Sequence, residues 1–204
     1  MVVVNAPSDD PPAGDPPVEG APAENPPPVG APAAPAPDDK DWTWVLEAAC
    51  PDCGYAASAV RADDLAGAIA QATLPWSAVL ARPDAGVRPS PAVWSPLEYG
   101  CHVRDVCRLF DTRTRLILDE DDPVFTNWDQ DATAVEDRYW AQDPTVVAAE
   151  LATASATLAA TYAAVPPDAW ERPGRRSDGS AFTTASLGRY LLHDLVHHLA
   201  DVDA

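Results

Sequence analysis

The clearest helix start in the chain lies in residues 94–105, which read WSPLEYGCHVRD. Ser95 is a favourable N-cap, Pro96 occupies the first helical position, and Glu98 stands three residues after the cap, which together form a capping box. Apolar residues then recur at helical spacing until the chain turns acidic after Leu118. This stretch therefore predicts a long amphipathic helix.

Three further helices are predicted around it. The first covers about residues 62–81 and is interrupted at Pro75, the third covers about 143–164, and the fourth begins at 183–184 and reaches the C-terminus. No alternating strand pattern is present. We expect an all-α fold, a four-helix bundle with one long crossover. The crossover between the second and third helices is long enough to allow them to run parallel.

Composition divides the chain into three parts. Residues 1–40 hold more than half of the 23 prolines and no aromatic residue, so we expect a disordered acidic tail rich in proline and alanine. Residues 41–61 form a lead-in with a CxxC motif, and residues 62–204 form the bundle. The N-terminus lacks the features of a signal peptide, and no apolar run reaches the roughly 18 residues of a membrane span. We therefore expect a cytoplasmic protein with no membrane partner.

The chain is strongly acidic, with a formal net charge of −19. A negative field of this size repels a phosphate backbone and argues against a nucleic-acid partner. It is also what a well-solvated surface carries, so the charge alone selects no function. We expect a small-molecule substrate, and the sequence leaves a homodimer open.

Histidine is rare in the chain, yet three of the four histidines fall at spacings that suit a metal. His193 and His197 lie four residues apart on the fourth helix, which puts their Cβ atoms about 5–6 Å apart on one face. With His102 from the second helix they predict a three-histidine site whose fourth position is open, as in catalytic zinc sites. Nickel or iron would also suit imidazole ligands. Half-buried structural histidines are the alternative.

Nearby acidic residues are candidates to orient these histidines. Asp105 stands three residues after His102 and is the best of them, so it is predicted to be the catalytic carboxylate. Asp194 and Asp201 could play the same part. His198 lies about 140° around the helix from the first histidine of the pair and is expected to point away from the site.

Two other stretches could shape a substrate or cofactor pocket. Trp128 interrupts the long crossover, and Arg175 and Arg176 belong to a small basic cluster that could hold a carboxylate. A tryptophan that plugs the bundle end, and arginines paired with neighbouring acids, are the simpler alternatives.

The four cysteines are not expected to form disulfides in a cytoplasmic chain. Cys50 and Cys53 form the CxxC motif, whereas Cys101 and Cys107 lie six residues apart, about 240° around a helix, and cannot share a face. A four-cysteine zinc site therefore has little support. The CxxC stays open between an added zinc knuckle, a redox pair and two simple thiols.

The two histidine-bearing stretches, residues 94–105 and LHDLVHH at 192–198, resemble the DinB-like superfamily of bacterial metal-binding four-helix bundles. The superfamily includes the YfiT-type proteins and the N-terminal domains of mycothiol-dependent maleylpyruvate isomerases. It places one metal ligand in the second helix and two, four residues apart, in the last, which map onto His102, His193 and His197. The CxxC departs from the family pattern.

The resemblance implies a divalent-metal-dependent enzyme, a low-molecular-weight thiol S-transferase or a related hydrolase, with the thiol as a co-substrate in the first case. Two alternatives come from other classes. One is a non-catalytic binding or stress-response module that its metal stabilises, and the other is a CxxC thiol switch on a helical scaffold.

Overall fold

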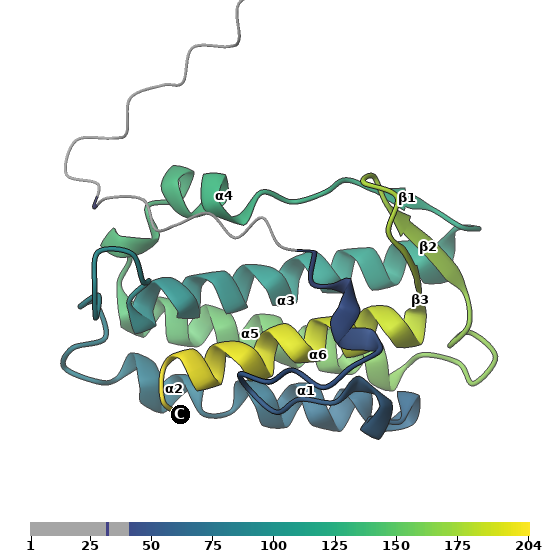
Figure 1. Cartoon of the computed structure of the whole chain (residues 1–204), viewed down its shortest axis with the longest axis horizontal. Coiled ribbons are helices and arrows are strands. Elements are labelled where there is room, and N and C mark those ends of the chain that lie inside the picture. Colours follow the sequence, from purple (N-terminus) through teal and green to yellow (C-terminus); the bar gives the residue numbers. More distant parts are fainter. Residues whose placement is uncertain (1–31, 33–40) are drawn as a thin grey trace, which may run out of the picture.

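The computed structural model describes residue 32 and residues 41–204, and a bundle of helices forms its body (Figure 1). The bundle helices are the consecutive pair α1 (Leu65–Thr73) and α2 (Trp76–Leu80), then α3 (Pro96–Asp119), α5 (Pro144–Ala163) and α6 (Thr184–Asp201). Both α1 and α3 pack against α5 and α6, so the helices enclose one core. The predicted all-α four-helix bundle is confirmed, while the predicted tail, residue 32 apart, lies outside the described residues.

The helix starts follow the local sequence. At α3 the Ser95 hydroxyl accepts a hydrogen bond from the Glu98 backbone N–H, and the Glu98 carboxylate accepts one from the Ser95 N–H at 2.9 Å. Asp143 caps α5, and Thr183 forms a second capping box at α6. Pro75 separates α1 from α2, as expected for a residue that lacks the backbone donor.

A small sheet at one end of the bundle fixes the helix directions. Strand β1 (Val124–Phe125) follows α3 and pairs in parallel with β2 (Pro173–Arg176), which follows α5; β2 pairs antiparallel with β3 (Ala181–Thr183), which leads into α6. Helices α3 and α5 therefore end at the same end and run parallel, as predicted, and α6 runs against both (Figure 1). The prediction of no strands was wrong, because strands of two to four residues are too short to show an alternating pattern.

The crossover from α3 to α5 returns along the bundle (Figure 1). It contains α4 (Gln130–Glu136) and the short 3₁₀ turn η4 (Tyr139–Ala141), and both contact α3. The Cys101 thiol lies 3.9 Å from the Tyr139 backbone oxygen, which places the end of the crossover beside the start of α3. The crossover thus covers the α3 face that carries His102.

The lead-in packs against α6 through three 3₁₀ turns, η1 (Thr43–Leu46), η2 (Ala57–Ala59) and η3 (Ala62–Asp64). Two hydrogen bonds tie it there. Tyr55 Oη donates to the Arg189 backbone oxygen, and Arg189 Nε donates to the Val60 backbone oxygen, each at 2.9 Å. The lead-in therefore lies along α6, whereas the crossover lies along α3.

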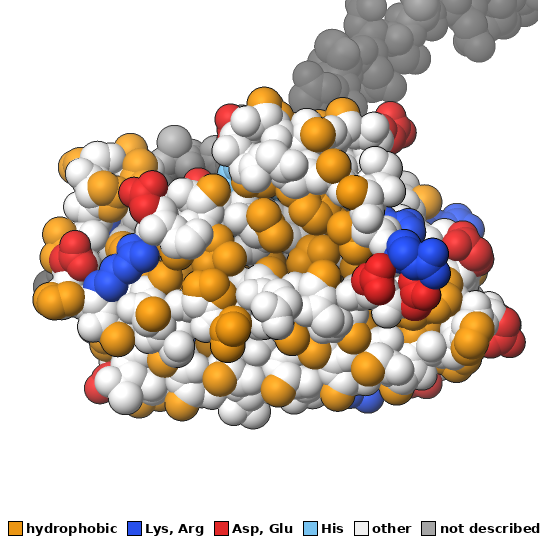
Figure 2. Space-filling model, turned by 90° about the horizontal axis from the view of Figure 1, so that it is seen from below, with side chains coloured by type: hydrophobic (Ala, Val, Ile, Leu, Met, Phe, Trp, Pro, Cys, Tyr) orange, Lys and Arg blue, Asp and Glu red, His pale blue; other side chains and the backbone are white. Residues whose placement is uncertain are grey.

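Helix α5 is long and apolar enough, by length and composition, to cross a membrane. Its apolar stripe is instead buried in the core, with Leu158 and Tyr162 almost fully covered. Helix α6 approaches α5 closely at Gly188, where a Cβ would lie 2.6 Å from the Tyr162 ring. On the face of the bundle that carries α1 and α2, hydrophobic side chains spread across the middle and charged ones lie towards the ends (Figure 2).

Candidate metal centre

Side chains from α3 and α6 converge on one point. His102, Asp194 and His198 each offer a ligand atom, and these atoms lie within 4.8 Å of one another. His102 Nε2 is 3.5 Å from Asp194 Oδ1, and His198 Nε2 is 3.7 Å from the same oxygen. Two imidazoles and one carboxylate form a donor set that suits zinc and other divalent metals.

The local sequence explains this convergence. Asp194 and His198 are four residues apart, so they share one face of α6, and that face is turned towards α3. His102 lies in the second turn of α3, just after the capping box that fixes the start of this helix. The His102 and His198 rings meet almost at right angles, with centroids 4.8 Å apart.

Several polar atoms of this group are buried without a hydrogen bond. They are His102 Nδ1, His102 Nε2 and Asp194 Oδ1. A buried polar atom that lacks a partner costs free energy, because it has given up water without replacement. Coordination of a metal would satisfy His102 Nε2 and Asp194 Oδ1 together, so the residues present fit a metal centre.

A second carboxylate orients His198. Asp201 Oδ2 lies 2.8 Å from His198 Nδ1, which fixes the ring so that Nε2 faces Asp194. Carboxylates commonly hold a metal-binding imidazole in this way. Although burial alone would raise the pKa of Asp194, the neighbouring His198 and His102 hold it down at about 2. The Asp194 carboxylate is therefore ionised at neutral pH, as a metal ligand must be.

The group lies at a pocket of about 850 Å³. Asp194 and His198 form part of its wall, while His102 is fully buried. Aromatic rings surround the group: Trp128 stacks on His102 with centroids 5.4 Å apart and planes 13° from parallel, and Trp94 lies 5.5 Å from the same ring. The group is therefore a candidate metal centre that a small molecule could reach.

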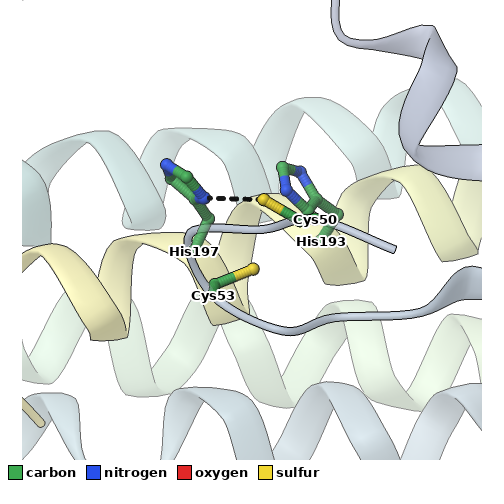
Figure 3. A group of neighbouring side chains, drawn as sticks. All are labelled: Cys50, Cys53, His193 and His197. Carbon is green, nitrogen blue, oxygen red and sulfur yellow. Dashed lines mark hydrogen bonds between the residues drawn. The ribbon is translucent and has the colours of Figure 1, made fainter. Parts of the chain in front are cut away.

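His193 and His197 belong to a different group (Figure 3). Their ring nitrogens lie within 4.8 Å of the sulfurs of Cys50 and Cys53 in the lead-in. Cys50 Sγ is 3.7 Å from His197 Nδ1. Burial, with a further contribution from His197, lowers the pKa of His193 to about 4, so this imidazole is neutral at physiological pH.

The structure thus divides the predicted three-histidine set between two groups. His102 faces Asp194 and His198, and the predicted partners His193 and His197 face the lead-in. The reason is the rotation of α6, since one residue along a helix turns the side chain by about 100°. The prediction that His198 points away from the site was wrong, because its ring faces His102. The missed signal is that Asp194 and His198 are also an i,i+4 pair.

The predicted catalytic carboxylate, Asp105, has partners other than His102. Asp105 does not hydrogen-bond His102; its carboxylate accepts bonds from Arg104 and from Tyr139 Oη, the latter at 2.7 Å. The side chain of Asp105 is turned to these partners because Arg104 and Tyr139 are buried beside it. The prediction that Asp105 orients His102 therefore has no support in the structure.

Two of the three predicted pocket residues line the pocket. They are Trp128, whose Nε1 donates to Thr133 Oγ1, and Arg176, which pairs with Asp178 at 2.6 Å. Arg175 is not part of that wall and forms an ion pair with Asp122 instead. Neighbouring residues of a strand point to opposite faces, which separates the two arginines.

Residues 68–202 match the family model of the DinB superfamily. The fold is similar to that of YfiT from Bacillus subtilis, which is described as a probable metal-dependent hydrolase with an unusual four-helix bundle topology. The two chains share 17% sequence identity, with a TM-score of 0.61 over 70% of this chain and 84% of YfiT. No curated protein sequence matches this chain. The family match spans the bundle helices and leaves out the CxxC of the lead-in.

Proposed function

The chain belongs to the DinB superfamily, and from that premise we propose that it is a divalent-metal-dependent enzyme whose metal is held by His102, Asp194 and His198. One observation carries the proposal. Buried ligand atoms without a hydrogen bond, from two helices, meet at the wall of a pocket large enough for a small molecule. A non-catalytic metal-stabilised module would need neither the pocket nor an open coordination position.

The reaction that fits best is transfer of an electrophilic group to water or to a low-molecular-weight thiol. When bound, a divalent metal supplies a Lewis acid that lowers the pKa of a water or thiol nucleophile. Asp201 would hold His198 in the tautomer that leaves Nε2 free to bind. The description of YfiT as a probable hydrolase supports water as the acceptor. The two imidazoles and the carboxylate suit zinc, with nickel or iron as alternatives.

The walls of the pocket suggest the substrate class. Trp94, Tyr99 and Trp128 offer aromatic faces that would hold a small organic group and exclude water from the centre. The charged wall residues are mostly aspartates, and the basic one among the described lining residues, Arg176, is already paired with Asp178. The aspartates are Asp41, Asp52, Asp129, Asp131, Asp178, Asp194 and Asp201. We therefore propose a neutral or cationic substrate, and the same charge preference for a thiol co-substrate.

The test is a substrate panel with the full chain loaded with zinc, nickel or iron. Neutral and cationic esters, amides and other electrophiles would be assayed with and without low-molecular-weight thiols. We expect metal-dependent turnover that falls more than about 100-fold in Asp194→Asn, since loss of a ligand exceeds the effect of losing a residue that only orients one. Turnover that Asp194→Asn leaves unchanged would contradict the assignment of the site. Full metal occupancy without turnover of any panel member would favour the non-catalytic module. The acidic surface and the reduced cysteines agree with action in the cytoplasm.

A further inference from the structure

The proposed function does not use the second group, Cys50, Cys53, His193 and His197 (Figure 3). We propose that these four side chains bind a zinc ion that fastens the lead-in to α6, at a site separate from the proposed active site. The inference does not depend on the reaction proposed above, because it rests on different donor atoms and on a different face of α6.

The backbone around the CxxC forms a tight knuckle. Cys50 N–H donates to the Tyr55 oxygen at 2.8 Å, and Gly54 N–H donates to the Cys50 oxygen at 2.9 Å. Gly54 has a φ of +73°, a left-handed conformation that glycine adopts without strain. The turn thereby places both sulfurs beside the α6 histidines (Figure 3). This turn lies before the residues that the family model matches.

Two of the four donors, Cys50 and His193, are buried, and the other two are half-buried. Cys50 and His193 are 1% and 4% exposed, and His193 Nε2 has no hydrogen bond. A buried thiol, a half-buried thiol and an imidazole nitrogen without a hydrogen bond gain little from each other, but zinc would displace the thiol protons and bind all three donors at once.

The donor set and spacing select the metal and the role. Two thiolates and two imidazoles, supplied as C-x₂-C and H-x₃-H, are a tetrahedral zinc set. Four protein ligands leave no position for water or substrate, which marks a structural site. The Trp42 ring lies 5.4 Å from the His193 ring and 5.2 Å from the His197 ring, so this indole packs against both imidazoles.

The proposed zinc site would also shape the proposed active site. Asp41, Trp42 and Asp52 of the lead-in line the same pocket as Asp194 and His198. Asp201 connects the two groups, because its Oδ1 lies 3.9 Å from His197 Nε2 while its Oδ2 holds His198. A zinc ion at Cys50 and Cys53 would therefore fix one wall of the pocket, to which His193 and His197 also belong.

The test uses metal content and cobalt spectra of the full chain. Reduced wild-type protein should bind about two metal equivalents, one per group, and its cobalt form should show a thiolate-to-cobalt charge-transfer band. The double variant Cys50→Ser/Cys53→Ser should lose one equivalent and the band. His102→Ala should lose the other equivalent and keep the band, so failure of either site is seen separately. Cys101→Ser, a buried thiol outside both groups, is the matched control and should keep both.

Alkylation of the wild type covers the case in which the double variant does not fold. Bound zinc should protect Cys50 and Cys53 from alkylation, and a chelator should expose them, as read by mass spectrometry. Reduced protein at saturating cobalt without the thiolate band would overturn the proposal and leave a simple thiol pair. Equal alkylation of the two cysteines with and without zinc would overturn it as well.

Discussion

Two groups of metal-binding side chains lie on adjacent faces of one helix, and they differ in almost every other respect. The group of His102, Asp194 and His198, here called the open group, joins α6 to α3 with two imidazoles and a carboxylate. The group of Cys50, Cys53, His193 and His197, here called the closed group, joins α6 to the lead-in with two thiols and two imidazoles. The pairs on α6 are offset by a single residue.

The number of protein ligands separates the two roles. Three protein ligands at a pocket leave a coordination position for a nucleophile, whereas four protein ligands leave none. One helix can therefore hold a reaction centre on one face and a structural fastener on the next. The closed group then explains how a lead-in outside the family match is held where it completes the pocket.

The largest effect is expected when the open group loses a ligand. Asp194→Asn keeps the shape of the side chain but removes the charge, and the metal affinity of the open group should fall more than about 100-fold. The closed group should keep its zinc. Competition with a chelator, followed by the cobalt spectrum, measures both. The exposed Asp84→Asn is the control for the charge change and should alter neither. Equal losses from both groups would mean that they are one centre.

Much of this arrangement could be predicted from local sequence. The capping box at Ser95, the long crossover and the parallel run of α3 and α5 all follow from neighbouring residues, and so does the i,i+4 pairing on α6. The rotation of α6 could not be predicted, because it depends on packing against α3 and the lead-in. Two pairs on α6, His193 with His197 and Asp194 with His198, are offset by one residue. The rotation of the helix decides which pair lies beside His102. The contact of Cys50 with His197 joins residues 147 apart, and no local pattern reports it.

A second prediction concerns the buried ion pair at the start of α3, the helix that carries His102. Glu98 is 1% exposed and accepts hydrogen bonds from Ser95 and from Arg88 Nε at 2.8 Å. Glu98→Gln leaves Arg88 without its ion pair, so the free energy of unfolding should fall by about 3 kcal/mol, a factor of about 100 in the equilibrium. Zinc in the closed group should stay bound. The exposed Glu136→Gln is the control.

The pH dependence of this loss has a definite sign. Burial alone would raise the pKa of Glu98, but Arg88 and Ser95 lower it below its ordinary value. The ion pair therefore stabilises the fold above the unfolded-state pKa of about 4.3, and the stabilisation is lost as the pH falls through the lower folded-state pKa. Urea unfolding of the metal-free protein should show the wild type and Glu98→Gln converging in acid. A difference that stays constant with pH would contradict this account.

Asp201 tests how far the two groups are coupled. Its carboxylate holds His198 at 2.8 Å but lies 3.9 Å from His197, so the substitution Asp201→Asn should act unequally. We expect the metal affinity of the open group to fall about tenfold, the lower end of the range for residues that orient a ligand. The closed group should change less. Cobalt titrations of each group measure the two affinities. A larger loss of affinity at the closed group would show that Asp201 supports that group more than the open group.

The smallest effects should come from the two tryptophans, one over each group. Trp128 stacks on His102, and Trp42 lies against His193, while both line the pocket. An aromatic contact of this kind contributes about 0.5–1.5 kcal/mol, so Trp128→Ala should weaken metal binding at the open group about three- to tenfold and leave zinc release from the closed group unchanged. Trp42→Ala should do the reverse, with faster zinc release from Cys50 and Cys53. Because both variants enlarge the same pocket by one indole ring, a general loosening would affect both groups alike. If each variant weakens metal binding only at the group that its ring contacts, each tryptophan stabilises that group specifically.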